Sequence, residues 1–402
     1  MTTTPATRPS TPTPRRTTAT EGPAAAHPLA RFGLLRDLPR PSAALANLGP
    51  NWFASIMGTG IVANAAVTLP FPVPGLRVAA TGVWLLASAL LLALCAAWLA
   101  HWVRHPSAAR GHAADPVMAQ FYGAPPMALL TVGAGSLLLG QGLLGGLAVD
   151  VSWALWFAGT AAGLVSAVSI PYLMFTRLEL SGDSVFGGWL MPIVPPMVSA
   201  ATGALLVPDV APGQDRLTML LACYALFGLS LLASVIVTTL IWQRLALHKV
   251  GPARLVPTLW IVLGWLGQSV TAANALGGVA HLALPAPYGV AFEVFGLVYG
   301  LPVFGFALLW VALAAAVTVR CARARLPFSL TWWSFTFPVG TVVTGTSALA
   351  AHTGSTALAW AAGLGYLGLV GAWGTVAART ARGSLRGTLF LPSVPGGRQL
   401  AT

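Results

Sequence analysis

Ten uncharged polar side chains recur near the middle of long apolar runs in this chain of 402 residues. Hydroxyl and amide groups can donate hydrogen bonds to an anion without holding it tightly. They perform no catalysis alone, and the sequence contains no Gly-rich phosphate loop, His-Glu-x-x-His motif or nucleophile elbow. The ten are Ser55, Thr59, Thr131, Ser199, Thr202, Ser269, Thr271, Asn274, Thr341 and Thr344.

The cysteines and histidines form no pattern typical of a reactive centre. Cys95, Cys223 and Cys321 have neither Cys-x-x-Cys nor metal-ligand spacing, so we expect them to be packing residues. None of the seven histidines lies in the middle of an expected helix with a facing partner, which argues against a haem-bearing bundle. The sequence predicts no enzyme activity, no cofactor and no metal.

Composition and hydropathy place the chain in a membrane. Hydrophobic residues make up 56% of it and charged residues 7%, with a mean hydropathy of +0.78. Ten apolar runs are long enough to cross a hydrocarbon core of about 30 Å. Because spanning backbone must satisfy its own hydrogen bonds, we expect an all-α polytopic membrane protein with ten helices. The runs are about 50–68, 77–103, 117–144, 150–175, 188–208, 217–243, 255–284, 288–318, 330–351 and 355–378.

Both ends of the chain differ from this apolar body. Residues 1–45 are rich in Thr, Pro, Ala and Arg and are expected to be a disordered, basic cytoplasmic tail. They lack the apolar segment of a signal peptide. A polybasic tail can touch anionic lipid or a partner, but a solvated tail is the simpler interpretation. Residues 46–380 form the expected transport domain, and residues 381–402 a cytoplasmic C-terminal tail.

Basic residues indicate the orientation of the runs in the membrane. With a cytoplasmic N-terminus, 19 of the 21 Lys and Arg fall on the inner side, and Arg77 and Arg216 alone fall outside. This is the bias that basic residues impose on cytoplasmic loops. The net charge of +12 therefore reflects topology and not a nucleic-acid surface.

Small or helix-breaking residues mark the odd-numbered runs at steps of 69 to 72 residues. This period indicates one helical hairpin repeated five times. Proline in a helix frees backbone groups that are tolerable at membrane depth only inside protein or facing water. Any single mark is also consistent with helix packing through small residues. The marks are Met57-Gly58-Thr59-Gly60, Pro125-Pro126, Pro195-Pro196, Gly267-Gln268-Ser269 and Phe337-Pro338.

We therefore expect the odd runs to form an inner ring around a central pore, with the Leu- and Ala-rich even runs outside. Gly58 and Gly60 would thin the helix wall, and Ser55 and Thr59 would share one helix face. The expected pore-lining residues are Ser55, Gly58, Thr59, Gly60, Pro126, Thr131, Pro196, Ser199, Thr202, Gln268, Thr271, Asn274, Pro338, Thr341 and Thr344.

Two segments resemble a known family. "NWFASIMGTGIVANAA" (51–66) resembles the first helix of the tellurite-resistance/dicarboxylate transporter family, especially its sulfite-exporter branch, and "LTWWSFTFPVG" (330–340) resembles its ninth helix. That family also includes slow anion channels. The resemblance implies ten helices in five hairpins around a pore, assembled as a homotrimer. It also implies that a phenylalanine of the ninth helix closes the pore, and the matching residue is Phe337. Phe335, two residues away, must point elsewhere.

Two transport classes remain open from the residues. One is a channel or facilitator of the plasma membrane for monovalent anions, sulfite or small dicarboxylates. The other is a coupled secondary carrier exporting sulfite or C4-dicarboxylates, which needs a proton or ion site. No Asp, Glu, Lys or Arg lies within the five odd runs, so the residues favour the first class. Small anions and the lipid bilayer are the expected partners, and nucleic acid is not.

The charge bias makes a prediction about topology. Reporter domains fused after residues 110, 250 and 325 should all report a cytoplasmic location, because each site follows a basic inner segment. The measurement is the activity of a reporter that is active on only one side of the membrane. An external signal from any of the three fusions would overturn the alternating scheme.

Overall fold

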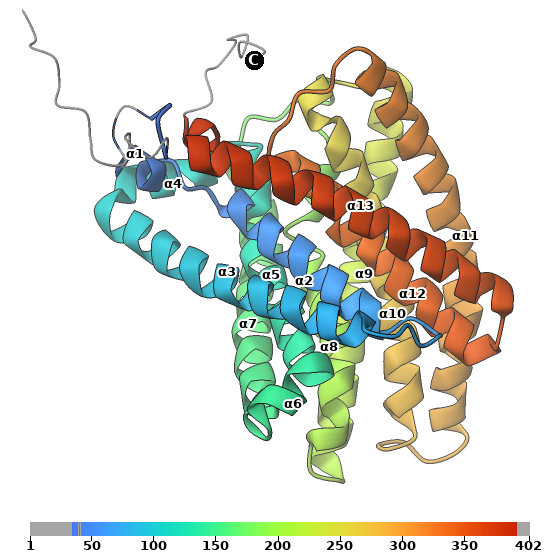
Figure 1. Cartoon of the computed structure of the whole chain (residues 1–402). Helices are drawn as coiled ribbons and strands as arrows, with labels where there is room; N and C mark the ends of the chain where they lie inside the picture. The colour runs from blue at the N-terminus through green and yellow to red at the C-terminus, as the bar shows by residue number, and fades with distance from the viewer. Residues whose placement is uncertain (1–33, 39, 41, 392–402) are drawn as a thin grey trace, which may run out of the picture.

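The computed structural model describes residues 34–38, 40 and 42–391, and this part of the chain is helical and contains no β-strand (Figure 1). Seven of its helical segments are long and apolar enough to cross a membrane, judged by length and composition. The prediction of an all-α membrane protein is therefore confirmed. The seven are Leu76–Arg104, Met118–Leu144, Leu147–Thr176, Gln214–His248, Ala253–Ala280, Tyr288–Arg323 and Thr356–Arg386.

Five shorter, buried helices alternate along the chain with five longer ones. We call the first group the inner helices: α2 (Ala54–Val67), α5 (Ala124–Gly135), α8 (Pro195–Leu206), α10 (Ile261–Ala280) and α12 (Phe337–Thr353). We call the second group the outer helices: α3 (Leu76–Arg104), α7 (Leu147–Thr176), α9 (Gln214–His248), α11 (Tyr288–Arg323) and α13 (Thr356–Arg386).

A short 3₁₀ segment leads into every inner helix. These segments are η2 (Pro50–Phe53), η3 (Met118–Gly123), η5 (Gly187–Leu190), η7 (Ala253–Trp260) and η8 (Leu330–Phe335). The remaining helical turns lie in the connections: α1 (Ser42–Ala46), α4 (Pro106–Ala114), η4 (Ser136–Gly140, a π-helix), α6 (Gln141–Leu144), η6 (Val207–Asp209) and η9 (Thr388–Phe390).

The inner helices contact one another in a closed order. α2 packs against α5, α5 against α8, α8 against α10, α10 against α12, and α12 against α2. Each also packs against the outer helix that follows it in the chain. Burial separates the two groups: 83% of the apolar window of Ala253–Ala280, which contains α10, is buried, but only 17% of that of α11.

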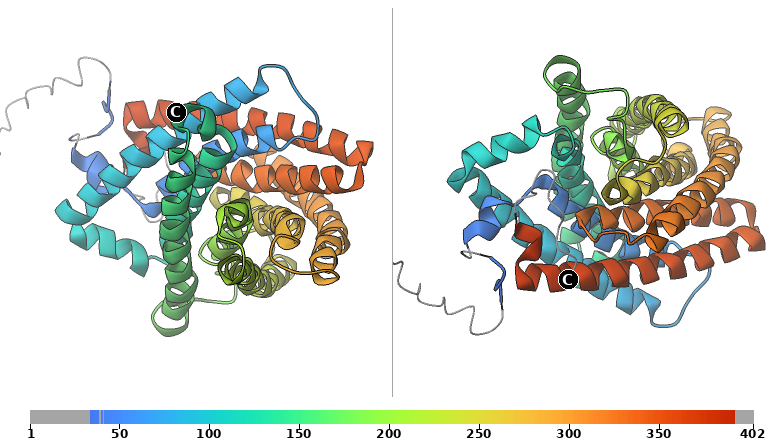
Figure 2. Two further views of the ribbon diagram at one scale, coloured as in Figure 1. Left: turned by 90° about the horizontal axis from the view of Figure 1, so that it is seen from below. Right: turned by 90° about the horizontal axis from the view of Figure 1, so that it is seen from above.

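The first and last hairpins lie side by side and close this order. α2 contacts both α12 and α13, although these helices lie near opposite ends of the chain. Figure 2 shows α8 to α11 nearly end-on, while α3 and α13 cross them at a steep angle. All inner helices run from the side of the described chain ends, which we call the terminal face, toward the opposite side, the far face (Figure 1).

The prolines occupy a different place from the one predicted. They were expected to kink helices near mid-depth, but Pro126, Pro196 and Pro338 lie in the first turns of α5, α8 and α12. A first-turn N–H has no partner within its helix, so a proline there removes no hydrogen bond from the helix. The fixed φ of proline also favours the start of a helix. The prolines thus begin the inner helices part-way through the fold.

Side chains of the outer helices bind carbonyls of the inner segments. Ser166 of α7 donates to Pro192 O at 3.0 Å, the carbonyl whose i+4 partner would be the N–H that Pro196 lacks. Trp84 of α3 and Trp156 of α7 donate to Val132 O at 3.1 Å and Ser199 O at 2.9 Å. Trp310 of α11 donates to Leu259 O at 2.8 Å. These bonds fix the inner helices and the segments before them to the outer layer.

The glycines of the inner helices serve close packing between helices. A Cβ on Gly267 would meet the backbone of Thr341, so α10 and α12 approach each other directly at this point. Gly58 lies against Trp333 and Thr336, and Gly60 lies against Thr131. Gly58 and Gly60 were expected to thin the wall of a pore. In this fold they allow close packing instead, because side chains of neighbouring segments occupy the space beside them.

The described parts of both tails are ordered against each other. Residues 42–46 form α1, and the N–H groups of Leu35 and Asp37 donate to carbonyls of Leu385 and Arg386. Trp52 stacks on Phe390, with ring centroids 4.7 Å apart. This part of the N-terminal tail, which was expected to be disordered, is therefore structured. Residues 1–33 and 392–402 lie outside the described part.

Candidate functional site

One cavity of about 620 Å³ lies between the inner helices and reaches the far face. All five inner helices contribute to its wall, and α11 adds Glu293. Its wall is mostly apolar with polar groups between. The lining residues are Ile61, Asn64, Thr68, Thr131, Ala134, Leu138, Val198, Ala201, Thr202, Leu205, Gln268, Thr271, Asn274, Ala275, Gly278, Glu293, Phe337, Thr344, Ser347, Ala348, Ala351 and His352.

Phe337, the first residue of α12, lies at the end of this cavity nearest the terminal face. Its side chain is 2% exposed, and the same residue also lines a second cavity of about 10 Å³. The second cavity is too small to hold more than one water molecule. The other residues around it, which we call the inner collar, are Met57, Met127, Met191, Val194, Ile261, Gly264 and Pro338.

The inner collar is uncharged and almost closed. Its side chains come from segments at the start of all five inner helices, so Phe337 and the collar form consecutive layers. At this level α10 contributes Gly264, one turn before the predicted mark Gly267-Gln268-Ser269. In the described fold, Phe337 and the apolar side chains of the inner collar therefore lie between the large cavity and the terminal face.

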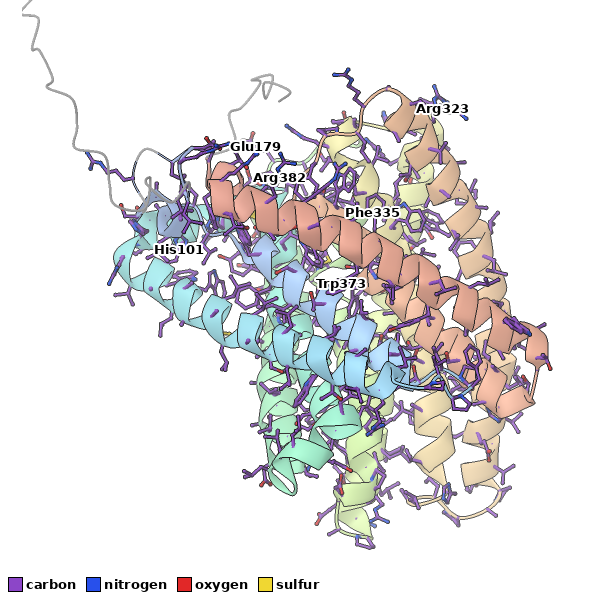
Figure 3. All side chains as sticks on the ribbon, viewed as in Figure 1. His101, Glu179, Arg323, Phe335, Trp373 and Arg382 are labelled. Carbon is purple, nitrogen blue, oxygen red and sulfur yellow. The ribbon has the colours of Figure 1, made fainter. Side chains whose placement is uncertain are left out.

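Phe335 points away from both cavities. Its ring packs edge-on against Trp260 at 5.5 Å and against Trp332 at 5.6 Å. Figure 3 labels Phe335 close to the start of α12. The two phenylalanines of the "WWSFTFPVG" segment thus have separate surroundings, as their spacing predicts.

Four threonine hydroxyls around the cavity have little capacity to donate. Thr131, Thr202 and Thr344 donate to backbone carbonyls three or four residues earlier at 2.7, 2.9 and 3.0 Å. Thr271 has Gly267 O at 3.0 Å and the Thr344 hydroxyl at 2.8 Å. A hydroxyl has one proton, so these oxygens face the cavity mainly as acceptors. The expectation that the hydroxyls would donate to an anion needs correction.

Gln268 is the lining amide with free donors, and the Ser347 hydroxyl in the same wall also has no hydrogen-bond partner among the described residues. Gln268 is 5% exposed, and its carboxamide makes no hydrogen bond to any residue that the structure describes. The amides of Asn64 and Asn274 differ, because they donate to Thr131 O at 3.0 Å and to Val270 O at 2.9 Å. A carboxamide carries two N–H donors and bears no charge. Gln268 can therefore turn a donor toward an anion in the cavity.

The predicted pore-lining residues divide into two groups. Seven predicted residues, Phe337 included, share the wall of the large cavity: Thr131, Thr202, Gln268, Thr271, Asn274, Phe337 and Thr344. The others lie outside this wall: Ser55, Gly58, Thr59, Gly60, Pro126, Pro196, Ser199, Pro338 and Thr341. Of these, Pro338 lines the small cavity.

The residues outside the wall contact neighbouring helices instead. Thr59 accepts from Trp373 Nε1 at 3.2 Å, where α13 crosses α2 (Figure 3). Ser199 accepts from Thr160 at 2.9 Å, and Thr341 donates to Leu263 O at 3.2 Å. Ser55 donates to Trp52 O at 2.7 Å. Polar groups near mid-depth thus serve two purposes, and sequence position alone does not separate them.

Sequence reasoning missed two lining residues that carry ionisable groups. His352, near the end of α12, has its Nδ1 atom 3.0 Å from Asn274 Oδ1. Its Nε2 atom lies 3.9 Å from the Glu293 carboxylate of α11. Both belong to the wall at the far face. No motif pairs them, because they lie 59 positions apart in the sequence, on the two different helices α11 and α12.

A model of the voltage-dependent anion channel family matches residues 47–381. The chain belongs to this family. The predicted resemblance, which included slow anion channels and sulfite exporters, is therefore confirmed.

Members with related sequences include named and uncharacterized transporters. A sulfite efflux pump of Trichophyton rubrum is 29% identical over 310 residues, which cover 76% of this chain and 82% of the relative. An uncharacterized transporter of Methanocaldococcus jannaschii is 27% identical over 299 residues, or 74% and 82% of the two chains. The sulfite efflux pump of Candida albicans is 26% identical over 322 residues, or 74% and 65%.

The cavity wall predicts which positions are accessible to water. Cysteines replacing Thr202 and Thr344 should react with small charged thiol reagents, because both residues line the cavity. Cysteines replacing Ser199 and Thr341, one turn away on the same helices, should stay protected. The measurement is the rate of labelling in a variant without Cys95, Cys223 and Cys321. Equal labelling within either pair would contradict the assigned wall.

Proposed function

We propose that this protein is an anion channel or facilitator whose path runs through the ring of inner helices and is closed at Phe337. The observation that carries the proposal is the cavity of about 620 Å³, which all five inner helices line and which ends on Phe337. A wide, weakly polar vestibule that stops at an apolar layer fits a pore gated by exclusion of water. Membership of the voltage-dependent anion channel family supports this proposal.

The proposed setting is the plasma membrane, with ten spans and both termini in the cytoplasm. The two faces differ in charge: Arg323 and Arg382 lie toward the terminal face (Figure 3), whereas Arg77 and Arg216 lie near the far face. The positive-inside rule then makes the terminal face cytoplasmic and the far face external. A homotrimer with one pore in each protomer remains a proposal that rests on the family resemblance.

Anion preference is proposed to come from weak donors and from the distribution of basic residues. Gln268 supplies uncharged N–H donors in the same cavity wall as Phe337, and no Lys or Arg among the described lining residues holds an anion in place. Weak binding suits permeation, because an ion must leave as readily as it enters. Cytoplasmic arginines raise the local anion concentration at the entrance.

Sulfite and other small anions are the proposed cargo. The relatives from Trichophyton rubrum and Candida albicans are named sulfite efflux pumps, which supports export of sulfite by this chain. The alternative, a coupled carrier for sulfite or C4-dicarboxylates, needs a titratable group that alternates between both sides. The described inner collar has none, so the channel reading is favoured.

The direct test is anion flux in proteoliposomes that contain the purified protein. Sulfite, chloride, nitrate, malate and succinate are compared at equal membrane potential and without a pH gradient. Flux that follows the electrochemical gradient of the anion alone supports a channel or facilitator. Flux that requires a proton gradient supports the coupled carrier, and absence of flux for all five anions rejects the proposed function.

Phe337→Ala should increase anion flux by about tenfold or more, which corresponds to a barrier lowered by at least about 1.4 kcal/mol. The substitution joins the two cavities that Phe337 separates, and the flexible methionines of the collar can then move apart. Flux is measured per folded protein, since loss of a packed phenylalanine costs roughly 3–5 kcal/mol of stability. Phe335→Ala is the control and should change flux far less. Equal or lower flux in Phe337→Ala would remove the gate from the proposal.

Gln268→Leu should reduce anion flux by about tenfold, because a hydrogen bond to a charged group is worth about 1.5–3 kcal/mol. Thr271→Val is the matched control on the same helix, and it should have a small effect because that hydroxyl already bonds within the protein. Both variants are compared by initial rates of nitrate and sulfite flux. If the valine variant loses as much flux as the leucine variant, Gln268 is not the main donor.

A further inference from the structure

The far-face end of the cavity holds a histidine whose protonation pattern is set by its neighbours. Asn274 Nδ2 lies 2.9 Å from Val270 O and 3.0 Å from Gly296 O, so it donates to both carbonyls. The remaining amide atom, Oδ1, lies 3.0 Å from His352 Nδ1. Because Oδ1 can only accept, His352 must carry a proton on Nδ1.

This arrangement leaves the other ring nitrogen facing a carboxylate. In neutral His352, Nε2 has a lone pair and lies 3.9 Å from Glu293 Oε1. Two acceptors then face each other without a proton between them. A proton added to Nε2 turns this contact into an ion pair. Histidine is the side chain whose charge ordinarily changes between about pH 5 and pH 8.

The pair is accessible from one side of the proposed membrane. The side chains of His352 and Glu293 are 25% and 53% exposed, and both line the cavity that reaches the far face. Phe337 and the apolar inner collar separate them from the terminal face. Protons from the external solution can therefore reach Nε2, whereas the described fold offers cytoplasmic protons no path to it.

The other charged groups near this mouth come from several elements. His281 ends α10 and lies against Gly289, one turn before Glu293 on α11. Across the cavity, Arg77 of α3 donates to Leu138 O at 2.8 Å, and Leu138 lines the wall. α2 contains no ionisable residue, and neither do residues 356–365 of α13. Asp150, Asp209, Asp215 and Arg216 lie at the far-face ends of other helices.

We propose that His352 and Glu293 form a proton-binding site by which external acidification increases anion flux through the cavity. When His352 is neutral, Glu293 presents an uncompensated negative charge beside the path, and this charge raises the energy of an anion in the cavity. When His352 is protonated, the pair is neutral and this repulsion disappears. The inference rests on the proposed function, because it concerns regulation of the same path.

The electrostatic effect acts on flux in both directions. In a passive pore, a charge that raises the energy of the anion along the path slows entry and exit alike at equal driving force. The expected change is roughly three- to tenfold for one unit charge a few ångströms from the path in a largely aqueous mouth. The site is therefore identified by the side of the membrane on which a change of pH alters the flux, because flux in both directions changes alike.

The experiment records nitrate currents in planar bilayers whose two sides are perfused separately. Nitrate stays fully ionised over the range, so titration of the permeating anion does not contribute. Acidification of the far-face side from pH 7.5 to 5.5 should increase current roughly three- to tenfold. Acidification of the terminal-face side should have no such effect through this site. That side has its own histidine pair, His101 and His112, with ring centroids 5.3 Å apart.

Three variants separate this site from other titrating groups. Glu293→Gln should give high current at both pH values, since the repelling charge is absent. His352→Gln should give low current at both, because Glu293 then stays uncompensated. His281→Gln is the control and should keep the response of the unaltered protein. Surface exposure of Glu293 and the conserved size of Gln make misfolding of the first variant a small risk, and size-exclusion profiles check all three.

The outcomes distinguish this inference from the proposed function. No nitrate or sulfite current at any pH would overturn the proposed function itself. Current that is present but unaffected by far-face pH would overturn the proton site alone. A pH response that persists in both Glu293→Gln and His352→Gln would assign it to another group and also overturn the proton site.

Discussion

The fold depends on supplying hydrogen-bond donors to irregular backbone at the depth of the membrane. The inner helices begin part-way through the fold after 3₁₀ segments, and proline removes donors at three of these starts. Uncompensated carbonyls would cost several kcal/mol each in hydrocarbon. Trp310 and Ser166 of the outer helices supply N–H and O–H groups to two of these segments, and Trp84 and Trp156 bind carbonyls within α5 and α8. The outer layer is therefore a structural requirement of the inner one and not only a boundary toward lipid.

The same requirement shapes the chemistry of the cavity. Threonines that bond back to their own helices satisfy carbonyls near the path, but they give up the donors that an anion would need. The wall is left polar enough for water, with Gln268 as its free amide within the described lining. Beyond Phe337 the inner collar offers only apolar side chains and backbone, which is the kind of layer that the proposed gating by exclusion of water requires.

Charge lies almost entirely at the two faces of the described chain. Arg77 and Arg216, the two arginines near the far face, bind carbonyls that follow α5 and α8, Leu138 O at 2.8 Å and Val210 O at 2.7 Å. They stabilise the negative ends of helices that finish beside the cavity mouth. Glu293 and His352 lie at the same face, so the mouth combines arginine side chains with a carboxylate and an imidazole.

The sequence by itself determined the membrane class, the positions of the helices and the alternation of buried and lipid-exposed segments, because hydropathy and charge bias act locally along the chain. It also indicated Phe337 and Gln268, which lie beside the cavity. Tertiary structure decided which polar groups face the cavity: Thr202 does and Ser199, three residues earlier, does not. It also brought His352 and Glu293 together. Both results depend on the rotation and the start of each helix, which follow from contacts between segments distant in the sequence, and no local pattern encodes these contacts.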